Sequence, residues 1–343
     1  LERGIQVADK LQLVRRAIPP TAAAAQLKGL IRHRHELVRE STERRNKLTA
    51  LCDELFPELV QVCKDPNAPA ALALRERFPT PQALATATLA ELQAVREGRH
   101  PSNADLLALQ RLAADTIGTK DLVRQRGLVL EQTQLIRELR LLRQHIDQLE
   151  AEIGTIVQEA REGQILLSIP GIGPVVAATI IASIGSIHNF PSAATLKAYF
   201  GWAPAVTQSG TTLDRATLTP GGTRIMKQMM FLSATKAIQQ SGGVWAQLYG
   251  RLVKAKCPYD ERLGRYTGKK KVLGRVAGQM IQVIYALLKR DAELVARVPK
   301  GHKLPPPQLY DPEVHQRHCH GDYTPMKSAA AQPTITLLPP SSR

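Results

Sequence analysis

The stretch LVLEQTQLIRELRLLRQHIDQLEAEIGTI, residues 128–156, decides most of the fold. Its apolar residues recur at alternating spacings of four and three, with one polar interruption at Gln132. This heptad pattern predicts a coiled coil or a long antiparallel helix pair, and a polar seam residue helps to set its register. The seam positions are Leu128, Gln132, Leu135, Leu139, Leu142, Ile146, Leu149, Ile153 and Ile156. We expect the seam to serve as a spacer or to join copies of the chain into a homo-oligomer.

The flanking sequence is also mainly helical. Residues 22–56 carry apolar positions at helical spacing and end at Pro57, and residues 69–98 suggest two short helices around Pro79 and Pro81. Glycine and other small residues become more frequent over residues 163–237, which predicts short helices there. A last helix is predicted over residues 272–288. With aromatic residues at only 4%, a large β-sandwich or barrel is excluded. The expected fold class is mainly α, with a helical linker, a compact helical domain and almost no sheet.

The positive charge of the chain is concentrated. Of 343 residues, 46 are Lys or Arg and 30 are Asp or Glu, and residues 201–300 alone hold 17 basic and 5 acidic residues. A docking face for a polyanion would concentrate charge in this way, so nucleic acid is the expected partner. The alternative is a solvated basic surface without a partner.

The cysteines and the apolar stretches narrow the class of protein. The four cysteines form no CxxC pair, which argues against a disulfide framework or a zinc ribbon and fits a reduced cytoplasm. No stretch of about 18 apolar residues is present, so we expect no membrane-spanning helix. The segment from 301 to 343 is rich in Pro, His and Ser, and we expect it to be a disordered tail.

The run SIPGIGP, residues 168–174, precedes an apolar helix and suggests a helix-hairpin-helix. Gly171 and Gly173 permit a tight turn whose amides, at a helix N-terminus, can bind a DNA phosphate without reading sequence. The alternative is a plain helical hairpin with a glycine turn.

Ser209 lies in a polar loop between this hairpin and Arg224. A serine hydroxyl can attack a phosphodiester when its proton is removed and cations hold the phosphate. Arg215 and Arg224 are candidates for those cations, and Lys227 is a further candidate nucleic-acid contact. Lys269, Lys270 and Lys271 form either another phosphate contact or a solvated cluster. On its own, a Ser-Gly pair is usually only a turn.

Taken in order, SIPGIGP, FPS at 190–192, YFGWAP at 199–204, QSG at 208–210 and GGTR at 221–224 resemble the carboxy-terminal domain of one transposase family. These are the insertion-sequence transposases related to the Piv DNA invertases, the insertion-sequence-110/116/902 group. The resemblance covers roughly residues 8–290. It implies that Ser209 is a nucleophile that joins transiently to DNA through a phosphoserine bond.

The resemblance also implies a second catalytic part. In that family an amino-terminal RuvC-like α/β domain binds Mg²⁺ through four acids, and recent members use a guide non-coding RNA that bridges donor and target DNA. Asp9 matches one acid as a catalytic and metal-binding residue, but Gln12 stands where the fourth acid is expected. The chain begins at Leu1, and we expect it to be amino-terminally truncated.

These patterns predict four segments. Residues 1–20 are expected to be the remnant end of the RuvC-like domain, 21–160 a helical linker, 161–300 the carboxy-terminal transposase domain and 301–343 the tail. The leading hypothesis is a cytoplasmic, nucleoid-associated bacterial transposase acting on DNA. The alternatives are a non-catalytic nucleic-acid-binding remnant of such an enzyme and a helical scaffold that assembles partners.

Overall fold

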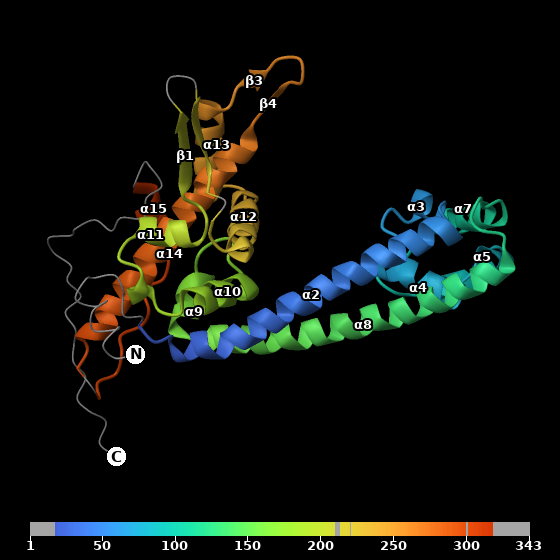
Figure 1. Ribbon diagram of the computed structural model, residues 1–343, viewed down its shortest axis with the longest axis horizontal. Coiled ribbons are helices and arrows are strands. Elements are labelled where there is room, and N and C mark those ends of the chain that lie inside the picture. Colours follow the sequence, from blue (N-terminus) through green and yellow to red (C-terminus); the bar gives the residue numbers. More distant parts are fainter. Residues whose placement is uncertain (1–17, 210–212, 220, 300, 318–343) are drawn as a thin grey trace. The chain divides into compact units, whose positions relative to one another are not determined.

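The computed structural model describes residues 18–209, 213–219, 221–299 and 301–317. It is mainly helical, as the sequence predicts (Figure 1). The chain divides into two compact units. We call residues 32–149 the helical-pair unit, and residues 18–31 with 150–317 the main unit. These boundaries fall inside two long helices, whereas the sequence suggested boundaries after residues 20 and 160.

In the helical-pair unit, helix α2 (Ala22–Leu55) lies antiparallel to α8 (Leu122–Glu159) (Figure 1). Leu48 and Leu51 of α2 form one apolar cluster with Leu135 and Leu139 of the heptad seam. The seam is therefore filled by a helix of the same chain, the second of the two arrangements that the heptads predict.

Five short helices complete this unit. They are α3 (Leu59–Val62), α4 (Pro69–Arg77), α5 (Pro81–Thr86), α6 (Leu89–Ala94) and α7 (Asn103–Ala114). Local signals start them: α4 and α5 begin with proline, and capping boxes headed by Thr88 and Ser102 satisfy the first amides of α6 and α7. The sequence suggested two helices over 69–98, and the structure has three.

Gln132, the polar residue of the heptad seam, binds a buried arginine. Its side-chain oxygen accepts a hydrogen bond from Nε of Arg75 at 2.9 Å, and the two residues are 3% and 5% exposed. Arg75 also donates to the carbonyls of Leu48 and Pro66. Burial lowers the pKa of the Arg75 guanidinium, and these oxygens compensate for the water it has lost. One network thus ties α2, α4 and α8 together.

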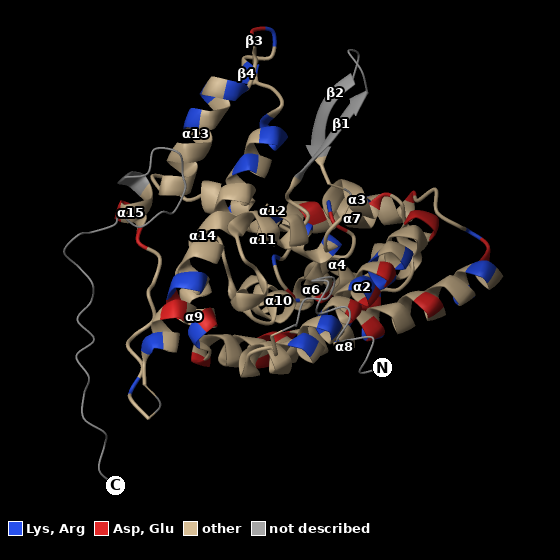
Figure 2. Ribbon diagram, turned by 60° about the vertical axis from the view of Figure 1, so that its left-hand side comes forward, with Lys and Arg blue, Asp and Glu red and all other residues tan. Residues whose placement is uncertain are grey.

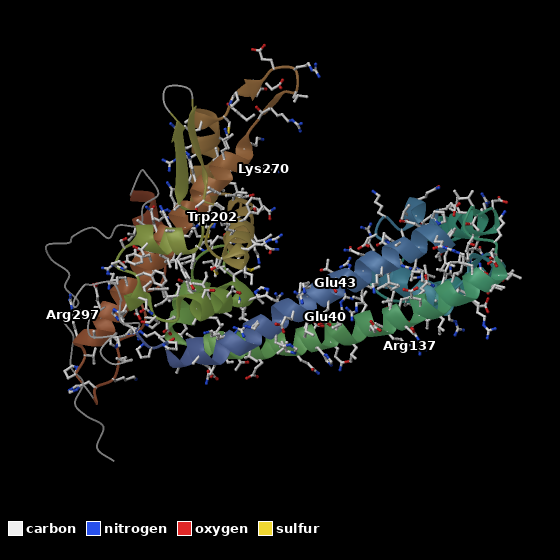
Figure 3. All side chains as sticks on the ribbon, in the orientation of Figure 1. Glu40, Glu43, Arg137, Trp202, Lys270 and Arg297 are labelled. Carbon is white, nitrogen blue, oxygen red and sulfur yellow. The ribbon has the colours of Figure 1, made fainter. Side chains whose placement is uncertain are left out.

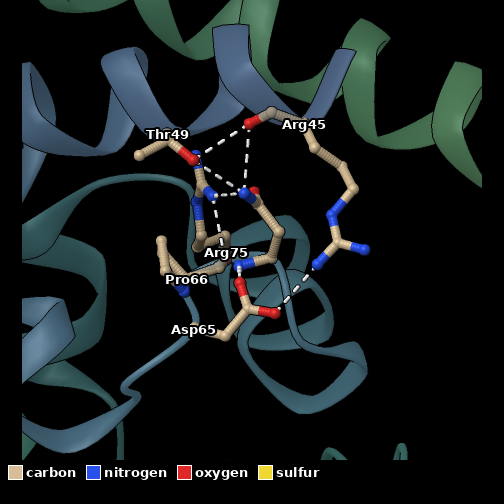
Figure 4. A network of polar contacts seen from close by, with 6 residues as sticks. Arg45, Thr49, Asp65, Pro66 and Arg75 are labelled. Carbon is tan, nitrogen blue, oxygen red and sulfur yellow. Dashed lines mark hydrogen bonds and ion pairs between the residues drawn. The ribbon is translucent and has the colours of Figure 1, made fainter. Parts of the chain in front are cut away.

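A second layer of polar contacts surrounds this arginine (Figure 4). The amide of Asn67 donates to the Arg45 carbonyl at 3.0 Å and to the Thr49 hydroxyl at 2.8 Å. The guanidinium of Arg45 forms an ion pair with Asp65 at 2.9 Å. The loop before α4 is therefore held against α2 by hydrogen bonds as well as by apolar contacts.

Helix α14 (Lys269–Arg297) is the central helix of the main unit, because its buried residues recur every three or four positions. Four elements pack directly on it: α9 (Arg161–Leu167), α11 (Ala193–Tyr199), α12 (Arg224–Ile238) and α13 (Val244–Lys256). The 3₁₀ helix η1 (Ile187–Asn189) also contacts it, and α10 (Pro174–Ile184) packs on α9 and α12. Arg161 and Asp291 join α9 to α14 through two contacts of 2.7 Å.

Residues 301–317 correct the expectation of a disordered tail from residue 301. The amide of Tyr310 donates to the Ser168 hydroxyl at 2.9 Å, and its ring stacks on Trp245 with centroids 6.4 Å apart. His315, in helix α15 (Pro312–Arg317), is 1% exposed. Two isolated ring side chains anchor this proline-rich segment. Because it has no helical periodicity, the sequence did not predict that it is ordered. Residues 318–343 lie outside the described part.

A β-hairpin corrects the expectation of a loop around Ser209. Strands β1 (Pro204–Ser209) and β2 (Leu213–Leu218) pair antiparallel, from Pro204 opposite Leu218 to Ser209 opposite Leu213. The β-branched residues of this segment favour strands, but the run is short and polar, so the sequence alone suggested a loop. A second short hairpin, β3 (Tyr259–Asp260) and β4 (Arg265–Tyr266), joins α13 to α14.

The base of the β1–β2 hairpin is a close crossing of two glycines. Gly201 and Gly222 adopt φ of 75° and 84°, and a Cβ on Gly222 would lie 2.4 Å from the Cα of Gly201. Only glycine fits such an approach. The amide of Thr223 donates to the Tyr199 carbonyl, and that of Thr219 to the Ala203 carbonyl. The crossing therefore sets the position of the hairpin at the start of α12.

The Arg75 network makes a prediction for stability. Changing Gln132 to Ala leaves Nε of a buried guanidinium without its acceptor, so the helical-pair unit should lose about 1–3 kcal/mol. Hydrogen exchange measured on peptides of α4 and α8 should show faster opening. The control is Gln134→Ala on an exposed position of the same helix, with an expected change within about 0.5 kcal/mol. Equal protection in both variants would contradict the role given to Gln132.

The glycine crossing makes a second prediction. Gly222→Ala should destabilise the main unit by more than Gly242→Ala, because both positions have positive φ but only Gly222 has backbone in the way of a Cβ. The strain of the left-handed conformation alone costs about 1–2 kcal/mol. Both tryptophans of the chain, Trp202 and Trp245, belong to the main unit, so urea unfolding followed by fluorescence reports on that unit. Equal losses would show that the crossing adds nothing.

Candidate nucleic-acid interface

The β1–β2 hairpin carries two of the residues singled out in the sequence. Ser209 ends β1 opposite Leu213, and Arg215 lies in β2 opposite Thr207. In this register positions 209 and 215 are diagonal neighbours in the ladder, which corresponds to a separation of about 7–8 Å. The hairpin thus brings together two residues that six positions of chain separate.

Arg224 and Lys227 lie at the base of the same hairpin. Arg224 is the first residue of α12 and is exposed. It lines a shallow, open depression with Trp202, Leu218, Lys227, Gln228 and Phe231. The ammonium of Lys227 donates to the carbonyl of Thr219 at 2.6 Å. Lys227 therefore fastens the end of β2 to α12, and Arg224 is left as the outward-facing cation of the pair.

The two glycines of the SIPGIGP run have different environments. The turn lies between two helices, α9 and α10. Gly171 has φ of 91°, and a Cβ there would lie 2.4 Å from the Ser233 carbonyl oxygen of α12. Its lack of a side chain is thus explained by close packing on α12. Gly173 is the N-cap of α10 and has open space around it, so phosphate binding remains a prediction for this position.

Lys269, Lys270 and Lys271 form the first turn of α14 and are all exposed. They belong to a larger basic surface, residues 251–275, which comprises the end of α13, the β3–β4 hairpin and the start of α14 (Figure 2). Its other cations are Arg251, Lys254, Lys256, Arg262, Arg265 and Arg275, and all of them are exposed. We call this set the basic surface.

The basic surface differs from the other cation-rich part of the chain. In the helical-pair unit, several arginines form ion pairs with acids: Arg44 with Glu138, Arg45 with Asp65, and Arg140 with Glu76 and Glu97. Among the described residues, no ion pair joins a cation of the basic surface to a carboxylate. Unpaired cations gathered on one surface favour a phosphate backbone as partner. Sequence analysis found the lysines but missed the hairpin that presents Arg262 and Arg265.

The metal expectation rests on Asp9, which lies outside the described residues, as does Gln12. Within the described part, no group of three or more His, Cys, Asp or Glu side chains is placed to hold a metal ion. The described residues thus do not form a Mg²⁺ site. None of the described helices is long and apolar enough to cross a membrane.

Comparisons with known proteins match the part of the chain that carries the β1–β2 hairpin. Residues 163–250 match the model of the transposase IS116/IS110/IS902 family. The chain is 27% identical over 289 residues to the 43.6 kDa protein of insertion element IS110 from Streptomyces coelicolor, covering 82% of this chain and 67% of that protein. It is 22% identical to the 44.8 kDa protein of insertion element IS116 from Streptomyces clavuligerus, covering 85% and 71%.

A third relative is the mini-circle putative transposase for IS117 from Streptomyces coelicolor, 28% identical over 57% of this chain and 49% of that protein. The matched family domain runs from α9 into α13 and includes the helix turn, the β1–β2 hairpin and Arg224. These are the elements on which the sequence resemblance was based, and the resemblance to the IS116/IS110/IS902 family of transposases is thereby confirmed.

Proposed function

We propose that this chain cuts and rejoins DNA through a serine nucleophile, Ser209. The observation that carries the proposal is the extent of the family match, which covers Ser209 and the cations Arg215 and Arg224 in one domain. The hairpin register supports it, because positions 209 and 215 are neighbours, and the glycine crossing joins the hairpin base to Arg224.

The proposed step is a transfer of one phosphodiester bond. The Ser209 oxygen attacks the phosphorus, a bond from Ser209 oxygen to phosphorus forms, and the bond from phosphorus to one strand oxygen breaks. The serine proton leaves to a base, and the released strand oxygen takes up a proton. Arg215 and Arg224 offset the negative charge that develops on the phosphoryl oxygens. The phosphoserine link replaces one ester by another, so the strand can be rejoined by the reverse reaction.

The remaining candidates bind the nucleic-acid backbone in this proposal. The amides at the start of α10, next to Gly173, and the lysines 269–271 contact phosphates without reading bases. DNA is the partner that the family implies, and the reaction would take place at the bacterial nucleoid in the cytoplasm. The guide RNA, the homo-oligomer and the Mg²⁺ that the resemblance implies are also part of the proposal.

The rival proposal is a nucleic-acid-binding remnant that has lost catalysis. It is favoured by Gln12, an amide at a position where the family pattern calls for a metal-binding acid. Such a protein would still bind DNA, with an affinity that falls steeply as salt rises, because counterion release drives contacts to phosphates.

Replacing Ser209 by Ala separates these proposals. Labelled DNA is incubated with the protein and Mg²⁺, and covalent complexes are counted on a denaturing gel. Ser209→Ala should reduce attachment by about 100-fold or more, since it removes the nucleophile, while the dissociation constant for DNA changes by no more than about twofold. The control is Ser241→Ala, an exposed serine between α12 and α13, which should behave as wild type.

Attachment that survives in Ser209→Ala would exclude this serine as the nucleophile. The wild-type protein could bind DNA in a salt-dependent way but form no covalent complex with it, whichever divalent metal is added. That result would favour the non-catalytic remnant over the enzyme.

A further inference from the structure

The β3–β4 hairpin projects from the main unit beyond the ends of α13 and α14 (Figure 1). We call residues 257–268 the arm. Tyr259 pairs with Tyr266 and Asp260 with Arg265, and the amide of Thr267 donates to the Pro258 carbonyl at 3.0 Å. The carboxylate of Asp260 accepts a hydrogen bond from the backbone amide of Leu263 at 3.0 Å, and this bond closes the turn. The arm is therefore an ordered hairpin, held by its own hydrogen bonds.

The arm contributes nothing to the apolar core, because none of its residues is among the buried hydrophobic side chains of the described chain. It instead exposes a large ring: Tyr259 is 56% exposed. The ring of Tyr266 meets it edge to face, with centroids 5.1 Å apart. This contact orients the Tyr259 ring while leaving more than half of the residue open to solvent. The pair stabilises the short hairpin, and it also leaves much of the Tyr259 side chain open to a ligand.

The basic surface, to which Tyr259 belongs, carries nine cations and two acids, Asp260 and Glu261. Arg262 and Arg265 lie on the arm itself, and the other cations of the basic surface lie on α13 and α14 at its root, where Figure 3 marks Lys270. The three lysines at 269–271 stand in the first turn of a helix, where the macrodipole disfavours positive charge. Helix stability therefore does not explain these lysines. A ligand that offers phosphates would account for both the lysines and the arginines.

An exposed ring among unpaired cations fits one form of nucleic acid better than another. In a regular duplex the faces of the bases are stacked on each other, so a tyrosine meets only their edges or the backbone. An unpaired nucleotide offers its face, and aromatic side chains beside a cationic backbone track are the usual way to bind it. Cations alone would be enough to bind the duplex backbone.

We propose that the arm binds an unpaired nucleotide, with the base stacked on Tyr259 and the flanking phosphates on Arg262, Arg265 and Lys269–Lys271. This inference rests on the proposed function in taking nucleic acid as the partner, and it adds a strand-state preference and the residue responsible. The nucleotide can belong to DNA opened near the cutting site or to an RNA strand, since both offer the same base face and phosphates.

The test measures binding by fluorescence anisotropy in EDTA, so that no strand is cut. The probes are a labelled 20-nucleotide DNA strand, an RNA strand of the same sequence, and the DNA duplex. Tyr259→Ala should weaken binding of the single strands by about 5- to 100-fold, the effect of losing one base–aromatic stack. It should change duplex binding by no more than about twofold, and Tyr259→Phe should bind as wild type.

The matched control is Leu263→Ala at the tip of the same arm, where the leucine is 48% exposed. It should leave binding of all three probes unchanged. Tryptophan fluorescence checks that each variant keeps a folded main unit. A stronger loss with the RNA strand assigns the stacked base to RNA, and a stronger loss with the DNA strand assigns it to DNA; either result supports stacking on Tyr259.

Three results would overturn the proposal. Equal losses on duplex and single strands would make Tyr259 a general backbone contact. A Tyr259→Phe variant as weak as Tyr259→Ala would replace stacking by a hydrogen bond from the hydroxyl. Loss of duplex binding in Leu263→Ala would make the arm a wedge between base pairs. Wild-type protein that binds none of the probes would instead count against the proposed function as a whole.

Discussion

The close crossing of the chain at Gly201 and Gly222 is the constraint on which the candidate interface depends. It lets the backbone leaving α11 pass within contact distance of the backbone entering α12, so the β1–β2 hairpin rises from one fixed point. Lys227 secures the same point by its bond to the Thr219 carbonyl. A side chain at Gly222 would collide with the backbone of Gly201 and so displace the hairpin from the start of α12.

Sequence reasoning succeeded where a pattern is local and periodic. The heptads of residues 128–156 predicted a coiled coil or a long antiparallel helix pair, the structure has the helix pair, and Gln132 is buried in it as predicted. The partner of Gln132 was not predictable, because Arg75 is a single cation in a short helix and only folding brings it within 2.9 Å. The strands at 204–218, the segment anchored by Tyr310 and His315, and the arm are short and held by long-range contacts, so they leave little trace in composition or spacing.

The candidate site also contains features that the sequence predicts and features that only the structure explains. Ser209, Arg224 and the lysines 269–271 were found from residue types and from a family resemblance, and the structure places them on one unit of the chain. Gly171 illustrates the limit of motif reading, because its close contact with α12 explains the glycine without any ligand. Charge pairing also distinguishes the two units: several arginines of the helical-pair unit form ion pairs with acids, whereas no ion pair joins a described cation of the basic surface to a carboxylate.

Cross-linking is the most direct test of the central claim, which is that the main unit binds nucleic acid through the β1–β2 hairpin and the basic surface. Ultraviolet light would fix bound DNA or RNA to the wild-type chain, and mass spectrometry would locate the attached nucleotides. The account predicts adducts within residues 204–227 and 251–275, with few on residues 32–149. Adducts confined to the helical-pair unit would contradict it, because the basic surface would then have no part in binding.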